Sequence, residues 1–211
     1  MTQTLMHSKR IFSMGQLKQR FLLEQAQTDQ FFTEWHENLP ELTEAERVAL
    51  DKIYPRYLRH REQGELSEGT IQLLLVSPLL ELAGFYDEPF FVTTEPAVEI
   101  EVEDQDEVLR GRIDTLVVQE NFWVLVVESK RSINFSAALP QAIAYMMANP
   151  CPDRPVYGMA TDGDLFMFIK LQDQNPAQYD FSEPISLFVA RRNRLWDVLQ
   201  ILKGLAGRLK G

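Results

Sequence analysis

The sequence has only one cysteine, Cys151, so no internal disulfide can stabilise the chain. Its three histidines, His7, His36 and His60, are widely separated and lack paired cysteines, which excludes the usual zinc spacings. A GxxxxGK[ST] phosphate loop is also missing, so we expect no ATP-driven translocation from these residues. Because there is neither a signal-type stretch nor an apolar run of membrane-spanning length, the sequence predicts a cytoplasmic protein with no membrane partner.

Positive charge is scarce as well. The chain has 21 Lys and Arg against 31 Asp and Glu, a formal net charge of -10 that argues, as a total, against nonspecific binding of polyanions. Seven acids fall between Glu95 and Glu107, where an alternating pattern predicts the solvated face of a strand. Basic residues gather at Lys130 and Arg131 and again within 191–194, and either group could contact phosphates locally.

The first 64 residues predict an N-terminal helical extension. Helical patterns cover residues 16–37 and 43–61, and the sequence from Thr43 to Glu46 has the form of a capping box. Pro55 should kink or split the second helix. The aromatic residues of the first pattern recur near helical spacing, which is typical of core packing.

The chain of 211 residues is 45% hydrophobic, which is enough for one well-buried core, and we expect this core in an α/β domain of residues 65–211. A helix from Ser67 should be interrupted at Ser77-Pro78 and end at Gly84. Residues 156–161 and 165–171 read as a hairpin around Asp162-Gly163, and residues 194–210 as a closing amphipathic helix. Within that helix, Trp196 either packs under the sheet or marks an oligomer contact.

Charged residues end the apolar run FWVLVV, which is otherwise typical of a buried strand. Alternation over residues 124–130 puts Glu128 and Lys130 on one face. Asp114 lies early in a preceding strand, and the turn-like Glu120-Asn121 favours antiparallel pairing of the two strands. That pairing would bring both carboxylates together beside Lys130.

Two neighbouring carboxylates repel each other unless a cation neutralises them. Hard oxygen ligands suit Mg²⁺, with Mn²⁺ as the alternative. Such an ion polarises a phosphoryl oxygen and activates water, while the Lys130 ammonium could orient that water or stabilise developing charge. These parts fit phosphodiester hydrolysis, although an acid followed by ExK also occurs in many charged sequences.

The next helix, expected over residues 137–148 with Ser136 as its cap, adds a second motif. Gln141 and Tyr145 are an i, i+4 pair on one face, preceded by the small Ala138. They could face the site; the alternative is a solvated glutamine and a half-buried packing tyrosine.

From Ser67 to Leu171 the sequence resembles the PD-(D/E)xK nuclease superfamily, and within it the N-terminal nuclease domain of type I restriction enzyme motor subunits. GRID supplies Asp114, ESK supplies Glu128 and Lys130, and QAIAY supplies Gln141 and Tyr145. QxxxY is the more discriminating of these motifs, and Ile113 replaces the proline that names the superfamily.

The resemblance implies a restriction-endonuclease-like fold, a central mixed β-sheet flanked by helices, here with an N-terminal helical pair. It also implies that Asp114 and Glu128 are metal ligands, that Lys130 is catalytic and that Gln141 is tied to the site. The first-helix acid of the family corresponds to Glu68, with Glu81 as a substitute; either could also be an ordinary helix charge.

We therefore expect a Mg²⁺-dependent endodeoxyribonuclease that acts without a motor. Arg112 and Arg131 are candidate phosphate contacts, although Arg112 could equally form an ion pair at the sheet edge. Expected partners are DNA, a second copy of the chain for cutting both strands, and separate subunits of a restriction system. The alternative is a catalytically silent nuclease-fold module that binds nucleic acid or a protein partner.

Overall fold

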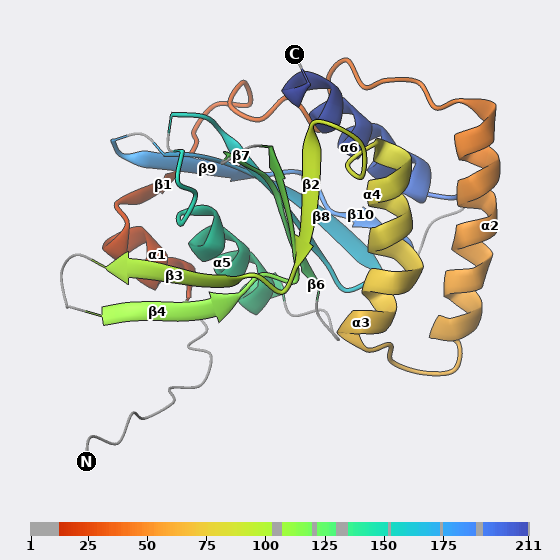
Figure 1. The fold of residues 1–211 in the computed structure, drawn as a ribbon, viewed down its shortest axis with the longest axis horizontal. Helices are drawn as coiled ribbons and strands as arrows, with labels where there is room; N and C mark the ends of the chain where they lie inside the picture. Colours follow the sequence, from red (N-terminus) through yellow and green to blue (C-terminus); the bar gives the residue numbers. More distant parts are fainter. Residues whose placement is uncertain are drawn as a thin grey trace.

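The computed structural model describes residues 13–102, 107–119, 122–129, 135–151, 153–173, 175–188 and 192–210. Its centre is a β-sheet with helices on both faces (Figure 1). The strands follow the order β1-β9-β8-β7-β6-β5-β2, and β10 pairs with β8 beside this path. The strands are β1 Leu23–Gln25, β2 Phe90–Thr94, β5 Thr115–Gln119, β6 Phe122–Ser129, β7 Val156–Thr161, β8 Leu165–Gln172, β9 Ala177–Phe181 and β10 Ile185–Ser186.

The sheet is mixed, as predicted. β6 runs parallel to β7 and β1 parallel to β9, whereas the other neighbouring strands are antiparallel. A parallel pair needs a crossover between its strands. Helix α5, Phe135–Met146, supplies it between β6 and β7 and packs against both.

A two-stranded ribbon extends from this sheet. It consists of β3, Ala97–Val102, and β4, Glu107–Arg112, which pair antiparallel. β3 follows β2 and β4 precedes β5, so the ribbon continues the β2–β5 hairpin beyond a bend (Figure 1). The expected strand with acidic residues is therefore present as β3, and the acids of residues 103–106 lie outside the described part of the chain.

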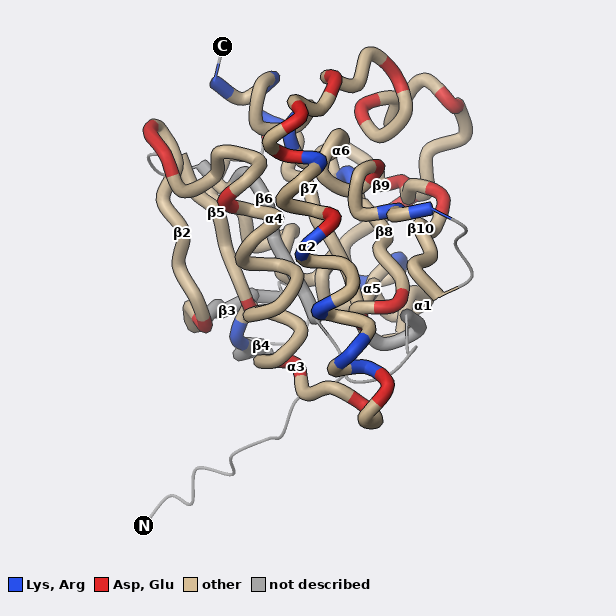
Figure 2. The backbone as a smooth tube through the Cα atoms, turned by 90° about the vertical axis from the view of Figure 1, so that its right-hand side faces the viewer, with Lys and Arg blue, Asp and Glu red and all other residues tan. Residues whose placement is uncertain are grey.

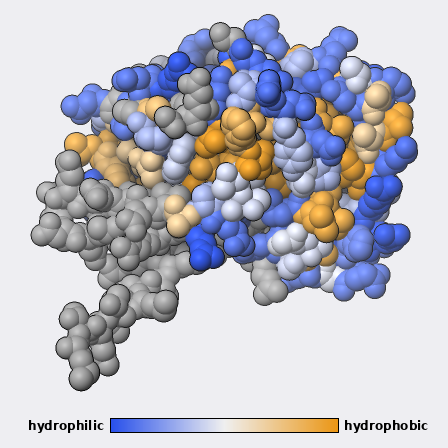
Figure 3. Space-filling model, in the orientation of Figure 1, coloured by the Kyte–Doolittle hydropathy of each residue, from blue (hydrophilic) through white to orange (hydrophobic). Residues whose placement is uncertain are grey.

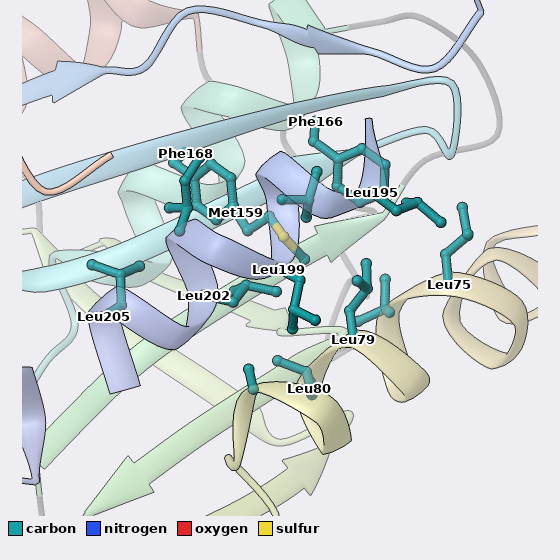
Figure 4. Close-up of a cluster of buried hydrophobic side chains, with 14 of the residues drawn as sticks. Leu75, Leu79, Leu80, Met159, Phe166, Phe168, Leu195, Leu199, Leu202 and Leu205 are labelled. Atoms are coloured by element: carbon teal, nitrogen blue, oxygen red, sulfur yellow. The ribbon is translucent and has the colours of Figure 1, made fainter. Parts of the chain in front are cut away.

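Apolar side chains from the two faces of the sheet form two cores. The alternation of strand residues separates them, since Val117 joins one core and Leu116 the other. The larger core lies under four helical segments: α2 Glu44–Arg61, η1 Gln72–Val76, α4 Ser77–Ala83 and α6 Leu195–Leu209. Figure 4 shows leucines of η1, α4 and α6 in one cluster with Phe166 and Phe168 of β8. The second core lies under α5 and the short α1, Met14–Arg20.

The β7–β8 hairpin is confirmed, and its turn chemistry explains it. Gly163 has a φ of +89°, which a glycine adopts without strain. The Asp162 carboxylate accepts hydrogen bonds from the backbone N–H groups of Asp164 (3.0 Å) and Leu165 (2.8 Å). Aspartate favours turns through this kind of bond to its own chain.

The helix predicted over residues 16–37 is wrong beyond Arg20. Leu22 has a φ of +47°, and the chain then enters β1, which pairs with β9. Phe32 is 2% exposed, so the aromatic spacing did reflect core packing, but from irregular backbone. Pairing with the sheet edge outweighs a marginal helical preference, which is rarely decisive for a short segment.

The second N-terminal helix is present as α2. Its Thr43 capping box forms, with the Thr43 side chain accepting from Glu46 N and the Glu46 carboxylate accepting from Thr43 N. Pro55 is exposed and does not split the helix, which continues through Arg61. The predicted helical pair therefore reduces to one short and one long helix; a domain boundary at residue 64 stays a prediction.

The segment from Ser67 differs from the prediction in one respect. Helix α3, Glu68–Ile71, passes directly into η1 and then α4, so Ser77-Pro78 does not begin a separately capped helix. The irregularity is instead a π-helical turn in η1. Gly84 ends α4 with a φ of +84°, as expected.

The closing helix α6 is confirmed, with Leu195, Val198 and Leu199 fully buried. Trp196 is half-buried and packs against the larger core. Among the described helices none combines the length and the apolarity needed to cross a membrane.

Candidate functional site

The candidate site lies at the bend between the main sheet and the β3–β4 ribbon. The β2–β5 ladder ends at the pair Thr94 and Thr115, and the β3–β4 ladder begins at Ala97 and Arg112. Two backbone hydrogen bonds bridge the bend, from Glu95 N to Asp114 O (3.3 Å) and from Ile113 N to Pro96 O (3.2 Å). Asp114 is therefore fixed at the bend, half-buried and immediately before β5.

Strand register brings Glu128 to the same place. β5 and β6 pair antiparallel, and their last pair on this side is Thr115 with Val127. One residue further along each chain, Asp114 and Glu128 are the next facing positions. Facing positions in an antiparallel ladder have Cβ atoms about 4.5–5.5 Å apart. The backbone of Glu128 pairs with Ala160 of β7, while its side chain lies outside the described part of the structure.

The lysine expected beside these carboxylates is not described. Lys130 and Arg131 both fall within residues 130–134, outside the described ranges. Within those ranges, no three His, Cys, Asp or Glu side chains gather closely enough to hold a metal ion. The metal set predicted from Asp114, Glu128 and Glu68 thus stays a prediction.

The predicted pair on α5 is in contact. Gln141 Nε2 donates a hydrogen bond to Tyr145 Oη at 2.8 Å. Tyr145 is 5% exposed and Ala138, two turns earlier, 3% exposed, so this face of α5 is buried rather than solvated. Gln141 lies between these two residues on the same face of α5 and is half-buried.

Helix α3 begins beside the bend. Ser67 caps it by accepting from Thr70 N, and Glu68 lies half-buried in its first turn. Four residues later, Gln72 Oε1 accepts a hydrogen bond from Thr115 Oγ1 at 3.2 Å. Glu68 lies one helical turn before Gln72, and Asp114 lies directly before Thr115. Figures 1 and 2 both place α3 at the ribbon end of the sheet.

This contact separates the two first-helix acids. Glu81 is exposed and lies thirteen residues beyond Glu68, a helical rise of about 20 Å. Its distance along the helix from Gln72 favours Glu68 over Glu81 as the first-helix acid, and that choice stays a prediction. Gln72 was missed in the sequence, although its spacing of four from Glu68 was a usable signal. Its position at the start of a π-helical turn is typical of functional sites.

The basic residues considered as phosphate contacts differ in their partners. Arg112 forms an ion pair with Glu95, with 3.6 Å between Nη1 and Oε2, and both side chains are more than 70% exposed. The alternative reading of Arg112 is thus the one seen here. Arg192 and Arg194 both pair with Asp197, which reduces their availability to phosphates, and Arg191 lies outside the described residues.

Comparisons with known proteins give little. No protein-family profile matches the chain. No curated protein matches it either. One solved structure with some similarity is a fragment assigned as the HsdR subunit of a type I restriction enzyme from Vibrio vulnificus YJ016, 16% identical with a TM-score of 0.37. The match covers 56% of this chain and 23% of that chain. A likeness at this level leaves the family of the chain open.

Proposed function

We propose that this protein is a metal-dependent nuclease that hydrolyses phosphodiester bonds in DNA without a motor of its own. The observation that supports this most is the β5–β6 register, which makes Asp114 and Glu128 the next facing positions at the bend. Like charges at facing positions destabilise a sheet, so a cation between them would be stabilising.

The oxygen donors fit Mg²⁺ or Mn²⁺. Asp114 and Glu128 would hold the ion, and Glu68, half-buried at the start of α3, would complete its protein ligands. When bound, the ion supplies Lewis-acid polarisation of the phosphoryl oxygen and a more acidic water. Lys130 would orient the attacking water or stabilise the charge that builds on the phosphate oxygens.

Positioning falls to the helices on either side. Gln141 is held by its bond to the buried Tyr145, which restricts the amide to one direction. Gln72 ties η1 to Thr115, the residue after Asp114. Arg112 could exchange its exposed pairing with Glu95 for a phosphate, since exposed ion pairs contribute at most about 1 kcal/mol.

The decisive experiment compares cleavage of supercoiled plasmid and single-stranded DNA by the wild type, Lys130→Ala and the control Lys18→Ala, with Mg²⁺ or Mn²⁺ at low salt. Lys18 is an exposed lysine of α1, so its loss changes the charge equally. We expect metal-dependent cutting that Lys130→Ala abolishes and Lys18→Ala retains. Equal activity in all three proteins would point to a contaminating nuclease and contradict the proposal.

The products of plasmid cleavage would show whether the enzyme acts with a partner. Nicked plasmid alone would indicate one site acting on one strand, whereas linear plasmid with a second-order dependence on enzyme would indicate a homodimer. If the pure chain cuts only after separate restriction-system subunits are added, those subunits are partners of the active enzyme. These outcomes also decide whether the chain acts alone.

A second candidate function is a silent module that binds a protein. Apolar side chains collect around β2 on the surface in Figure 3. Phe91 of β2 is 65% exposed and Leu73 of η1 is 71% exposed. Exposed apolar patches commonly mark interaction sites. A wild type that binds metal, judged by a thermal shift lost in Asp114→Ala, yet cuts neither substrate would favour this candidate.

A further inference from the structure

The C-terminal half of α2 carries an exposed basic face. Acids occur in α2 only up to Asp51; from Lys52 to Arg61 the helix has five basic residues and no acid. Lys52, Arg56 and Arg59 follow at spacings of four and three, which puts them on one side of the helix. All three are exposed, as is the neighbouring His60. In a chain with a net charge of -10, such a segregated positive face is unexpected.

The opposite side of α2 is anchored firmly. Tyr57 is fully buried, and its hydroxyl donates to Asp164 Oδ1 at 2.6 Å. Arg61 Nε donates to Asp164 Oδ2 at 2.8 Å, and Tyr54 Oη donates to the carbonyl of Leu187 at 3.2 Å. The basic face therefore sits on a rigid helix that is fixed to the β7–β8 hairpin.

The charges on this face have no acidic partner among the residues that the structure describes. In the described part of the chain, Lys52, Arg56 and Arg59 form no ion pair; the Arg59 guanidinium contacts only the His60 ring, at 3.4 Å. Arg61 differs, since Asp164 neutralises it. Bases near the C-terminal end of a helix interact favourably with its dipole, while like charges at these spacings repel one another weakly, so the three exposed charges are available to an external anion.

The face also lies at the same end of the molecule as the bend. Figure 2 shows Lys and Arg along the C-terminal half of α2, which leads to α3. Only residues 62–67 separate α2 from α3, and α3 and η1 reach the bend through Gln72. A backbone that crosses the bend could therefore continue onto α2.

The dimensions suit a nucleic-acid backbone. Lys52 to Arg59 spans about 10 Å of helix, at a rise of about 1.5 Å per residue. One DNA strand places a phosphate about every 3.4 Å along its axis, so the face can reach about three phosphates.

We propose that Lys52, Arg56 and Arg59 form a sequence-independent contact surface for the phosphodiester backbone of DNA. This inference rests on the proposed function only in taking DNA as the substrate; the binding itself needs neither metal nor catalysis. The surface supplies local positive charge in a chain whose net charge is negative. It would hold the DNA while the proposed site at the bend cleaves it.

The test measures binding of a short fluorescent DNA duplex by anisotropy in EDTA, so that no cleavage occurs. A triple variant, K52Q/R56Q/R59Q, is compared with K18Q/R208Q/K210Q, which removes the same charge from exposed residues of α1 and the end of α6. Circular dichroism and thermal unfolding establish that both are folded; exposed substitutions should leave them so.

We expect the α2 triple to bind about tenfold or more weakly between about 50 and 200 mM salt, and to reduce the slope of log K against log salt by about 2 to 3. The control triple should stay within about twofold of the wild type. Equal weakening in both triples, no weakening in either, or no DNA binding by the wild type would overturn the inference.

The nuclease proposal can fail separately. Metal-dependent cutting by the wild type, combined with normal DNA binding by the α2 triple variant, would support the nuclease proposal and contradict the proposed contact surface. Loss of DNA binding in the α2 triple variant, with no cutting by the wild type, would support the contact surface and contradict the nuclease proposal.

Discussion

Thr115 Oγ1 donates a hydrogen bond to Gln72 Oε1 at 3.2 Å and so joins the strand of the candidate site to the π-helical turn. The two residues are 43 positions apart in the chain, and Thr115 is 3% exposed. The contact ties η1, which follows α3 directly, to the strand that begins next to Asp114.

Thr115→Val tests this contact, because valine keeps the shape and removes the hydroxyl. We expect the free energy of unfolding to fall by about 0.5–1.5 kcal/mol, the usual net contribution of a hydrogen bond. DNA cleavage should fall about tenfold or more, since a small misplacement of a site strongly affects rate. Thr93→Val, at an exposed position of β2, is the control. Unchanged cleavage in Thr115→Val would separate Gln72 from the site.

The Gln141–Tyr145 bond can be measured by a double-mutant cycle with Gln141→Leu and Tyr145→Phe. A coupling of about 0.5–1.5 kcal/mol in unfolding free energy is expected for a direct hydrogen bond. If Gln141 positions the site, Tyr145→Phe should also lower kcat while leaving DNA binding in EDTA intact. Tyr86→Phe, which removes an exposed hydrogen bond to Ser77, is the control and should change neither kcat nor DNA binding. Full activity in Tyr145→Phe would make the pair purely structural.

Glu34 and Lys170 form a buried ion pair at 2.5 Å, and Tyr157 Oη also donates to Glu34 at 2.9 Å. Burial by itself raises the pKa of Glu34, but the hydrogen bond and charge of Lys170 bring that pKa below its ordinary value. The carboxylate therefore stabilises the fold above the ordinary glutamate pKa, and this stability is lost as pH falls through the lowered value. In urea unfolding, the wild type should lose its advantage over Glu34→Gln between about pH 5 and pH 3.

Removal of Lys170 alone should be more severe. Lys170→Met leaves a buried carboxylate without its cation, which costs about 3–5 kcal/mol at neutral pH. Adding Glu34→Gln should restore part of that loss, because it removes the unpaired charge. A double variant no more stable than Lys170→Met would contradict this account of the pair.

Asp162 offers the opposite case. Burial raises its pKa, and its Oδ2 atom is buried without a hydrogen-bond partner in the described part of the chain. A raised pKa means that the charged form is disfavoured in the folded state, so the penalty is present at neutral pH and disappears as pH falls below the ordinary aspartate pKa.

Asp162→Asn should therefore stabilise the protein at pH 7 by up to about 1 kcal/mol, because the amide keeps the accepting oxygen of the turn and removes the charge. The gain should shrink in acid. Urea unfolding at pH 7 and pH 4 measures both effects; Asp153→Asn, at an exposed loop position, is the control. Destabilisation at pH 7 would show that the charge is needed in the turn.

Local patterns decided those parts of the molecule in which neighbours along the chain suffice. The Asp162-Gly163 turn, the Thr43 capping box and the Gln141–Tyr145 pair each involve residues within a few positions, and each appears as predicted. The same holds for the amphipathic α6, where one buried stripe repeats at helical spacing.

Only the tertiary structure decided the rest, because it depends on partners distant in the chain. Residues 23–25 form a strand because they pair with β9, and the β5–β6 register makes Asp114 and Glu128 the next facing positions. Asp164 pairs with Arg61, 103 positions earlier in the chain. Lys52, Arg56 and Arg59 stay exposed on the other side of the same helix. Spacing along a sequence records which residues share a helix or strand, whereas which elements meet is set by the burial of apolar faces during packing.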